Sequence, residues 1–333
     1  MGTLDEERIS ESIKNFDYLD ELIHAGANEI VLDSDIILSD GEESKYSEGI
    51  YLDRDNLIID GNGHLIDAKG LTRIFFCVGK NIIIKGIELK NGFAEENGGS
   101  IFIDKGELVI RQSTICKSTS KYGGAIYNNE GEISIMESAL NENVARSNGG
   151  AIHNYKGKLM IFESTFSANN ANQGGAIHNY RAELNIGKTA LIENRAKDFG
   201  GAIFSNGDYL LIENSILNEN IANIGGAIYN NNGELNIMES SLKENMANIG
   251  GAINNLAMLK IRDSTLKLNK TKEHGGAIHN FDGEVSIESS LIIKNTSKTH
   301  GGGIFTNNSI DKLIDSVIEE NEVDNIYEIK SMK

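Results

Sequence analysis

The sequence predicts an all-β protein: a single-stranded right-handed parallel β-helix, wound as a three-sided solenoid of about 25 residues per rung, with an N-terminal capping helix. Three observations predict it. A Gly-Gly pair recurs every 25 or 26 residues, apolar residues alternate in short runs between the pairs, and proline is absent. A fixed period of this size is typical of solenoids, in which each repeat buries its apolar face against a stacked neighbour. Proline would interrupt the backbone ladder between rungs.

The chain divides into an opening segment, a β-helix and a tail, which together form one domain. Residues 1–28 are expected to form a polar segment with the capping helix, residues 29–321 the β-helix, and residues 322–333 a tail or cap. Residues 29–97 alternate like strands but lack the Gly-Gly phrase, so we expect irregular opening coils there. The phrase GGAI and its variants then fill residues 98–321.

A short amphipathic helix is predicted near the N-terminus. Residues 9–25 place Phe16 and Leu19, among others, at helical spacing, and Gly26 follows as a stop signal. An uncovered terminal coil would expose strand edges and apolar core, so we expect this helix to cover the first rung. The acidic residues 40–48 are expected to form a loop.

Three strands of four to six residues and three corners account for one period, and each strand contributes a column of apolar residues that we expect to face inward. The first column consists of Ile126, Ile152, Ile177, Ile203, Ile228, Ile253, Ile278 and Ile304. The second includes the pairs Ile133 and Ile135, Leu159 and Ile161, Leu184 and Ile186, and Leu235 and Ile237. The third consists of Leu140, Phe166, Leu191, Leu217, Leu242, Leu266, Ile292 and Ile318.

Three polar columns follow the same period, and we interpret all of them as structural, because residues repeated in every rung do not define one catalytic point. Stacked asparagines bond along the axis and tolerate left-handed corners, so two columns are predicted to be corner ladders. One is Asn143, Asn169, Asn194, Asn220, Asn245, Asn269, Asn295 and Asn321, and the other is Asn128, Asn154, Asn179, Asn230, Asn255 and Asn280. The third column is Ser113, Ser138, Ser164, Thr189, Ser215, Ser240, Ser264, Ser290 and Ser316.

The composition argues against two classes of function. Acidic residues outnumber basic ones by 49 to 31, for a formal charge of -18, and such a surface repels phosphate backbones, so we expect no nucleic-acid partner. Residues 1–15 lack the basic start and apolar stretch of a signal peptide, and no apolar run is long enough to insert into a membrane. Cys77 and Cys116 are expected to be free buried thiols. We expect a monomer.

The repeat phrases resemble those of a known group of surface proteins. The GGAI phrase, followed about 20 residues later by Leu/Phe-x-x-Asn, is similar to the repeats of chlamydial polymorphic outer-membrane proteins. The wider frame, with IIDGNGHLIDAKG at 58–70 and IIIKGIELKNG at 82–92, looks like the adhesin-like proteins of methanogenic archaea. The resemblance covers about residues 28–321 and implies a β-helix that is secreted or carried on the cell surface and mediates attachment. It implies a non-enzymatic protein that binds a glycan or a surface protein.

The best candidate site is a stripe of rings beside the isoleucine column. The residue after each isoleucine is predicted to point outward, and the candidate binding residues are Tyr127, His153, His178, Phe204, Tyr229, His279 and Phe305, with Asn254 interrupting the series. Such a stripe could stack sugar rings or receive a protein, because aromatic residues are enriched in binding surfaces. The alternative is that the rings only shield backbone hydrogen bonds and pack on one another.

The alternative function is a polysaccharide lyase or glycoside hydrolase of the pectin-lyase-like type, which needs clustered carboxylates. The densest acidic cluster is Asp53, Asp55, Asp60 and Asp67, with Arg54, His64 and Arg73 nearby. Because Asp60 and Asp67 flank a Gly-Asn-Gly turn, we interpret the cluster as turn chemistry and predict no catalytic residues. Two histidine pairs in neighbouring rungs, His153 with His178 and His274 with His300, lack carboxylate or thiolate partners, so we predict no metal and no cofactor.

Overall fold

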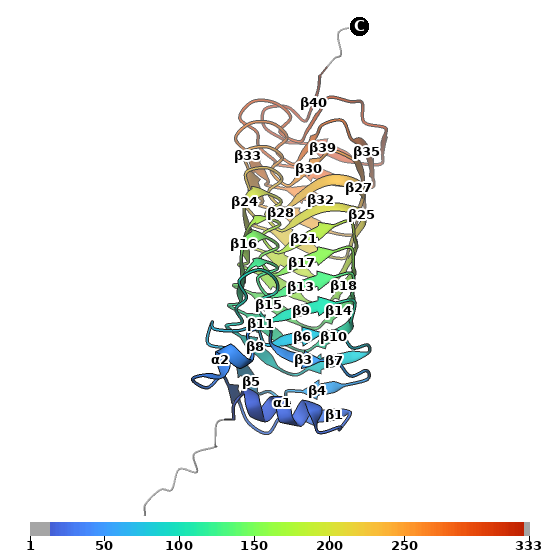
Figure 1. Ribbon diagram of the computed structural model, residues 1–333. Helices are drawn as coiled ribbons and strands as arrows, with labels where there is room; N and C mark the ends of the chain where they lie inside the picture. Colours follow the sequence, from blue (N-terminus) through green and yellow to red (C-terminus); the bar gives the residue numbers. More distant parts are fainter. Residues whose placement is uncertain (1–13, 330–333) are drawn as a thin grey trace, which may run out of the picture.

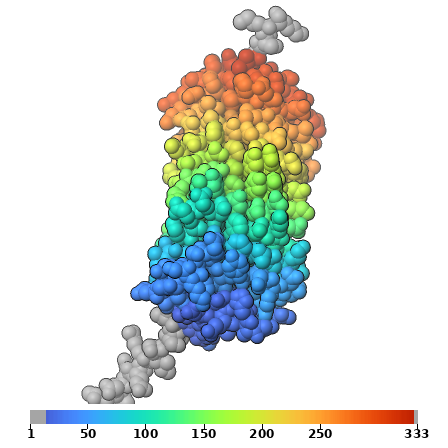
Figure 2. Space-filling model, viewed as in Figure 1, coloured from blue at the N-terminus to red at the C-terminus, as the bar shows by residue number. Residues whose placement is uncertain are grey.

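The predicted parallel β-solenoid is confirmed by a computed structural model, which describes residues 14–329. The chain coils about twelve times. The coils form a rod (Figures 1 and 2), and a helix lies across its N-terminal end (Figure 1). All strand pairings in the described part are parallel, and equivalent residues of successive rungs, such as Ile126 and Ile152, lie in register. No helix between residues 14 and 329 has the length and apolar character needed to cross a membrane.

The first two faces of the solenoid belong to one 22-stranded sheet. The first face contains β3 (Ile50–Leu52), β6 (Phe75–Cys77), β9 (Ile101–Asp104), β13 (Ile126–Asn129), β17 (Ile152–Tyr155), β21 (Ile177–Tyr180), β30 (Ile253–Asn255), β34 (Ile278–Asn280), β37 (Ile304–Thr306) and β40 (Ile326–Glu328). The second contains β1 (Glu29–Val31), β4 (Ile58–Asp60), β7 (Ile82–Lys85), β10 (Glu107–Arg111), β14 (Glu132–Met136), β18 (Lys158–Phe162), β22 (Glu183–Gly187), β31 (Met258–Arg262), β35 (Glu284–Glu288) and β38 (Lys312–Ile314). The long strands β25 (Ile203–Glu213) and β27 (Ile228–Met238) run through both faces.

The third face is a separate 12-stranded sheet. It contains β2 (Ile36–Ile37), β5 (Leu65–Asp67), β8 (Glu88–Lys90), β11 (Thr114–Cys116), β15 (Ala139–Asn141), β19 (Thr165–Ser167), β23 (Ala190–Ile192), β26 (Ile216–Asn218), β28 (Ser241–Lys243), β32 (Thr265–Lys267), β36 (Leu291–Ile293) and β39 (Val317–Glu319). The solenoid continues past Asn321, since β40 pairs with β37.

A fourth short strand, which the sequence did not predict, precedes the Gly-Gly pair in several rungs. These strands are β12 (Thr119–Tyr122), β16 (Val144–Asn148), β20 (Asn170–Gln173) and β24 (Arg195–Phe199), in a four-stranded sheet, and β29 (Met246–Ala247) with β33 (Lys270–Thr271). The segment leading to each Gly-Gly pair lies beside its equivalent in the next rung, so its extended residues bond to that neighbour. Each of these rungs therefore has one strand more than its three faces require.

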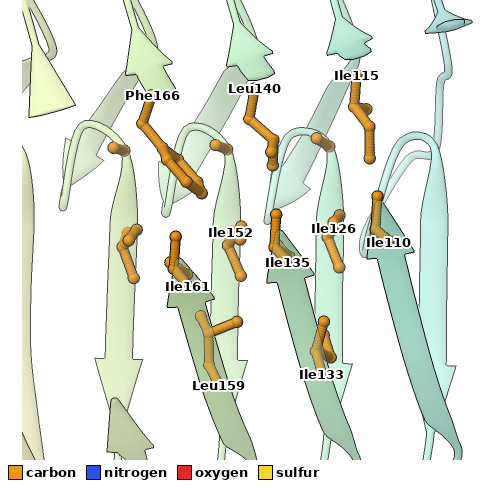
Figure 3. Packing of buried hydrophobic residues seen from close by; sticks show 14 of the residues in the cluster. Ile110, Ile115, Ile126, Ile133, Ile135, Leu140, Ile152, Leu159, Ile161 and Phe166 are labelled. Carbon is orange, nitrogen blue, oxygen red and sulfur yellow. The ribbon is translucent and has the colours of Figure 1, made fainter. Parts of the chain in front are cut away.

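The apolar columns fill the inside of the rod, as predicted. Every isoleucine of the first column has no exposed surface, and side chains from the other two columns, such as Ile135 and Leu140, close the same core (Figure 3). Burying one such side chain stabilises the fold by roughly 1.5–3 kcal/mol. The exception is Ile318 in the last rung, which is only partly buried.

The two glycines of each pair have different roles at the bend before the first face. Gly200 has a φ of 63°, a left-handed conformation that side chains rarely adopt. A methyl group on Gly201 would overlap the carbonyl oxygen of Gly226 in the next rung. The first glycine therefore makes the bend, and the second allows two rungs to stack closely.

A ladder of buried asparagines follows the third face. The Oδ1 atom of Asn220 accepts bonds from the backbone N and the Nδ2 of Asn194, at 3.0 and 3.1 Å. Its own Nδ2 donates to the carbonyl oxygen of Leu191 (2.9 Å) and to Oδ1 of Asn245 (3.0 Å). The left-handed corner residue is not the asparagine, as the sequence suggested, but the residue before it, such as Glu219 with a φ of 56°. The corner leaves backbone groups that the inward amide satisfies.

Replacing Asn220 by alanine is expected to lower the free energy of unfolding by roughly 2–4 kcal/mol, because it leaves the backbone N of Asn194 and one N–H of the Asn194 side-chain amide buried without partners, and removes a bond to the carbonyl of Leu191. Urea unfolding followed by circular dichroism would measure the loss. Asn223→Ala, which removes an exposed asparagine, is the control and should change stability by less than about 0.5 kcal/mol. Equal effects of the two variants would contradict the structural role of the ladder.

The predicted N-terminal helix covers the first rung, but it begins later than expected. Helix α1 spans Phe16–His24 and buries Phe16, Leu19 and Ile23 on the core. The side chain of Asn15 accepts a hydrogen bond from the backbone N of Tyr18, so Asn15 is the N-cap residue and the helix begins directly after it. Residues 9–13 of the predicted helix lie outside the described residues.

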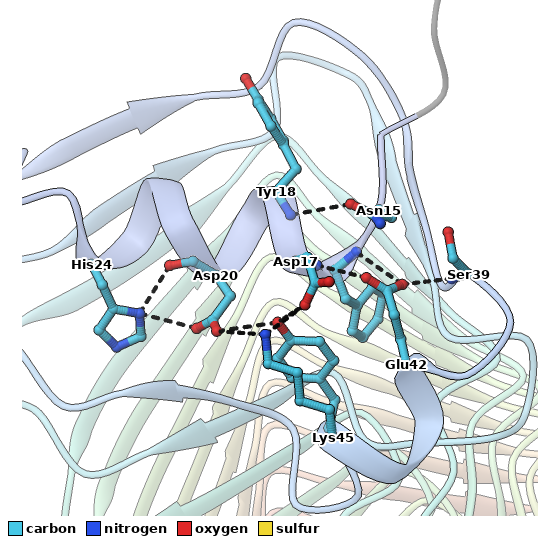
Figure 4. A network of polar contacts seen from close by, with 10 residues as sticks. Asn15, Asp17, Tyr18, Asp20, His24, Ser39, Glu42 and Lys45 are labelled. Atoms are coloured by element: carbon cyan, nitrogen blue, oxygen red, sulfur yellow. Dashed lines mark hydrogen bonds and ion pairs between the residues drawn. The ribbon is translucent and has the colours of Figure 1, made fainter.

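The acidic segment predicted as a loop contains a one-turn helix, α2 (Glu42–Lys45), that fastens α1 to the rod (Figure 4). The buried carboxylate of Glu42 accepts bonds from the backbone N of Phe16 (3.3 Å), Asp17 (2.8 Å) and Ser39 (2.6 Å). A carboxylate at the free N–H groups of a helix start is electrostatically favourable. A prediction based on hydrophobic periodicity misses such a short polar helix.

Candidate functional site

The predicted stripe forms a continuous ladder of stacked rings along the first face. Tyr127 and His153 have ring centroids 5.0 Å apart, His153 and His178 4.6 Å, His178 and Phe204 4.6 Å, and Phe204 and Tyr229 5.4 Å. The planes of neighbouring rings in these four pairs differ by 16° at most. Parallel in-register pairing of β13, β17, β21, β25 and β27 sets this spacing. We call this series, with its extensions below, the aromatic ladder.

The ladder extends further toward the N-terminus than the sequence analysis proposed. Tyr51 stacks on Phe76 at 4.8 Å, and Phe102 stacks on Tyr127 at 5.4 Å. Between them, Phe76 contacts Phe102 at 5.0 Å with ring planes tilted by 42°. These three residues belong to the opening coils and the first Gly-Gly rung. Their position could have been found from the register of the isoleucine column, since Phe102 follows Ile101 as Tyr127 follows Ile126.

Asn254 breaks the ladder, and a second short stack follows it. His279 lies 5.1 Å from Phe305, and Phe305 lies 5.5 Å from Tyr327. The Nδ1 of His279 is 2.8 Å from Oδ1 of Asn254, so the amide occupies the place of a ring and partners the imidazole. The predicted site residues therefore lie in two stacks, not one.

A groove of about 500 Å³ lies over the middle of the ladder, and we call it the ladder groove. Its floor is Tyr127, His153, His178 and Phe204. One wall consists of residues that directly precede the Gly-Gly pairs, namely Tyr122, Asn148 and Gln173. The opposite wall consists of residues two positions after the floor residues, namely Tyr155, Tyr180 and Asn206. Glu96 and Asn97 lie at one end of the groove.

The sequence analysis missed the walls of the groove, although a signal for one wall was present. Tyr155 and Tyr180 each lie two residues after a candidate histidine on the same strand, so they point to the same side of the sheet. Their rings stack at 5.9 Å, with planes 3° apart. Tyr122 meets His153 edge to face at 5.7 Å, from a strand that the sequence did not predict.

The floor of the groove presents ring edges, which corrects the expectation that sugars could stack on the faces of the stripe. Each floor ring has its faces covered by the rings above and below, and the floor residues His153, His178 and Phe204 are less than a tenth exposed. Ring edges carry partial positive charge. The floor therefore favours oxygen atoms of a ligand over flat apolar rings.

Burial keeps the two floor histidines uncharged. His153 is 6% exposed and His178 3% exposed, and burial lowers the pKa of His153 to about 3. Burial, with a smaller effect of His153, also holds the pKa of His178 well below its usual value. The Nδ1 atoms of both rings are buried without a hydrogen-bond partner. A proton on Nε2 leaves Nδ1 as an acceptor, so neither ring has a buried Nδ1–H group without a partner.

Two lysines beside the groove already have partners. Lys121 pairs with Glu96 at 2.9 Å at one end. Lys156 lies over the ring of Tyr155, 5.0 Å from its centroid, and contacts Glu130 at 3.5 Å. The groove thus combines ring edges, hydroxyls and amides with no free charge on its floor.

Two of the carboxylates considered for catalysis, Asp60 and Asp67, make turn and ion-pair contacts. Asp60 accepts a bond from the backbone N of Asn62 (2.9 Å) and contacts Lys85 at 3.1 Å, and these contacts help lower its pKa against the opposing effect of burial. Asp67 accepts bonds from the backbone N of Lys69 (2.7 Å) and from Nδ2 of Asn91 (2.9 Å). These contacts agree with the interpretation of the cluster as turn chemistry.

The histidine pairs stack instead of converging on a point. His274 and His300 lie 5.9 Å apart with planes 6° apart, and Oγ1 of Thr299 lies 2.8 Å from Nδ1 of His274. Within residues 14–329, no three His, Cys, Asp or Glu side chains come together in a way that could hold a metal ion.

Comparison of the chain with protein-family models, with curated protein sequences and with solved structures found no match. The geometry of the ladder groove is therefore the basis for the functional argument.

Proposed function

We propose that the protein is a non-enzymatic binding solenoid that holds an extended, neutral glycan in the ladder groove. The observation that carries this proposal is the lining: ring edges and neutral imidazoles on the floor, with tyrosine hydroxyls and amides on both walls. Such groups match a ligand rich in hydroxyl and ether oxygens. An anionic ligand would find no free cation on the floor, and a cationic one would meet the positive ring edges.

The repeat of the groove favours a glycan over a peptide strand. Lining groups recur once per rung, at roughly 4.8 Å, whereas side chains on one face of an extended peptide recur at roughly 6.6–6.8 Å. A peptide would therefore lose register with the walls within a few rungs. The resemblance of the GGAI phrases to adhesin-like repeats supports a place for the protein on the cell surface or outside the cell.

A glycan array probed with the full chain tests the proposal, and the wall tyrosines supply the variants. Tyr155→Ala and Tyr180→Ala are each expected to weaken binding of an array-positive glycan about tenfold or more, because both line the groove without belonging to the buried ladder. His153 and His178 are less suitable, because removing their buried rings would also disturb packing.

Tyr209→Ala is the matched control, since Tyr209 is a part-exposed tyrosine on the second face and does not line the groove. Its binding should equal that of the unmodified chain. An array without any bound glycan, or wall variants that bind like Tyr209→Ala, would refute the proposal. Binding of a protein partner that depends on the same tyrosines would assign the groove to protein recognition instead.

A further inference from the structure

A second pocket, of about 550 Å³, adjoins the ladder groove on its N-terminal side, and we call it the arginine pocket. Glu96 and Asn97 line both hollows, so the pocket and the groove meet there. The other lining residues that matter for its chemistry are Glu48, Arg73, Phe76, Phe93, Glu95 and Phe102.

The arginine pocket lies where the solenoid lacks its Gly-Gly bend. In-register pairing of β6 with β9 puts Arg73 in the position that Gly99, the second glycine of the pair, has in the next rung. Arg73 is only 6% exposed, and its guanidinium carbon lies 5.3 Å from the ring centroid of Phe102. The irregular opening coil therefore brings a charged group to a place where every later rung has a glycine.

Arg73 holds the walls of the pocket together. Its Nε donates to the carbonyl oxygen of Gly98 at 3.0 Å, and its Nη2 donates to that of Asn97 at 2.8 Å. Its Nη1 donates to the carbonyl oxygen of Glu48 at 2.8 Å and to Oε2 of the same residue at 2.9 Å. A guanidinium that is bonded to both neighbouring rungs fixes the pocket before a ligand arrives, which lowers the entropy cost of binding.

The three carboxylates that line the pocket each have a cationic partner. The pairs are Glu48 with Arg73 at 2.9 Å, Glu95 with Arg146 at 3.1 Å, and Glu96 with Lys121 at 2.9 Å. The paired carboxylates keep lone pairs that can accept hydrogen bonds from hydroxyl groups, and such charge-assisted bonds are strong. The polar lining therefore suits an uncharged ligand with several hydroxyls.

The pocket also offers what the floor of the ladder groove lacks, the face of an aromatic ring. Phe93 is half-buried, and within residues 14–329 no other aromatic ring stacks on it. Phe76 and Phe102 are tilted by 42°, so they do not cover each other as the parallel rings of the groove do. The negative face of an aromatic ring attracts the partly positive C–H groups on the flat side of a sugar ring.

We propose that the arginine pocket is a separate subsite that holds one uncharged pyranose unit of the glycan, with its C–H side on Phe93 and its hydroxyls on the carboxylates of Glu48 and Glu96. This inference rests on the proposed function of the ladder groove. Phe76 and Phe204 are five rungs apart, roughly 24 Å at roughly 4.8 Å per rung. Only a long oligosaccharide therefore reaches from the groove into the pocket.

Oligosaccharides of increasing length, prepared from an array-positive glycan, test the inference by calorimetric titration of the full chain. The unmodified chain should bind an oligosaccharide that spans both hollows about tenfold or more tighter than one that fills only the ladder groove. The double variant Glu48→Gln, Phe93→Leu should bind both alike, because it removes a carboxylate and a flat ring. Its new amide oxygen can still accept from Arg73, so it should bind the short oligosaccharide like the unmodified chain.

The matched control is the double variant Phe162→Leu, Glu163→Gln. Phe162 is half-buried at the end of β18, Glu163 pairs with Lys188 at 3.1 Å, and neither residue lines the pocket or the groove. This control should keep the full preference for the long oligosaccharide.

Three results would overturn the subsite but leave the ladder groove as a glycan site. They are equal affinity of the unmodified chain for short and long oligosaccharides, a preference for length that survives Glu48→Gln, Phe93→Leu, and a preference that the control loses as well. Absence of binding at every length would instead refute the proposed function, and the subsite with it.

Discussion

Gly201→Ala is expected to lower the free energy of unfolding by about 4 kcal/mol or more, the largest effect of any single substitution considered. The added methyl group would overlap the carbonyl oxygen of Gly226 and come within 2.7 Å of the backbone N of Ile221. Both obstacles are backbone atoms held by ladders on either side, so the neighbouring rung has no side chain that could rotate away. Urea unfolding followed by circular dichroism would measure the loss.

Gly187→Ala is the matched control, because the same change there meets only a flexible neighbour. The added methyl group would lie 3.0 Å from the ring of Phe162, with no backbone atom within 4 Å. A change of less than about 1 kcal/mol is expected. Similar stability of the two variants would show that the second glycine of the pair is not needed for close stacking.

Acidification is expected to destabilise the protein through the floor histidines of the ladder groove. An unfolded histidine has a pKa near 6.5, whereas burial lowers the pKa of His153 to about 3 and that of His178 also far below its usual value. Below pH 6.5 the unfolded state therefore binds protons that the folded state does not. The free energy of unfolding falls as the pH drops from about 6.5 toward 3, by on the order of 2 kcal/mol for each histidine at pH 5.

The double variant His153→Phe, His178→Phe isolates this contribution. Phenylalanine already occupies the ladder in nearby rungs, at Phe102 and Phe204, so stacking should be preserved. The variant should lose much less stability than the unmodified chain between pH 7 and 5 in urea titrations. Tyr127→Phe changes a ladder ring that does not titrate in this range, because burial raises the pKa of Tyr127 to about 12, and it should keep the original pH dependence. A double variant with unchanged pH dependence would contradict the role of the buried imidazoles.

The regular rungs could be predicted from the sequence because each position of the period carries the same type of side chain in successive rungs. Ile126 and its equivalents recur at the same place after each Gly-Gly pair, and Asn143 and its equivalents recur at the same distance from the third strand, so position in the rung decides burial. The short strand Val144–Asn148 could not be predicted, because its polar residues have no clear alternation. Helix α2 depends on a single carboxylate, Glu42, that bonds to residues 25 and 26 positions earlier.

The site was predicted only in part, because its shape depends on neighbours far along the chain. The stripe residues lie in one stack from Tyr127 to Tyr229, as their period indicated. The burial of these rings could not be inferred from the stripe residues alone. Tyr122 covers His153 from the rung before, and this contact arises only once β12 and the Gly-Gly bend are placed. Sequence reasoning therefore found the floor of the groove and missed its walls.

The in-register pairing of rungs has a consequence for how such a protein can change over generations. On its face, β17 contacts only the equivalent strands β13 and β21. A duplicated period of 25 or 26 residues would therefore contact rungs with the same residue pattern on both sides. Unequal crossing-over within the gene could thus lengthen or shorten the rod by whole turns while each turn keeps its contacts. Recombination would thereby set the number of rungs, and with it the length of the molecule.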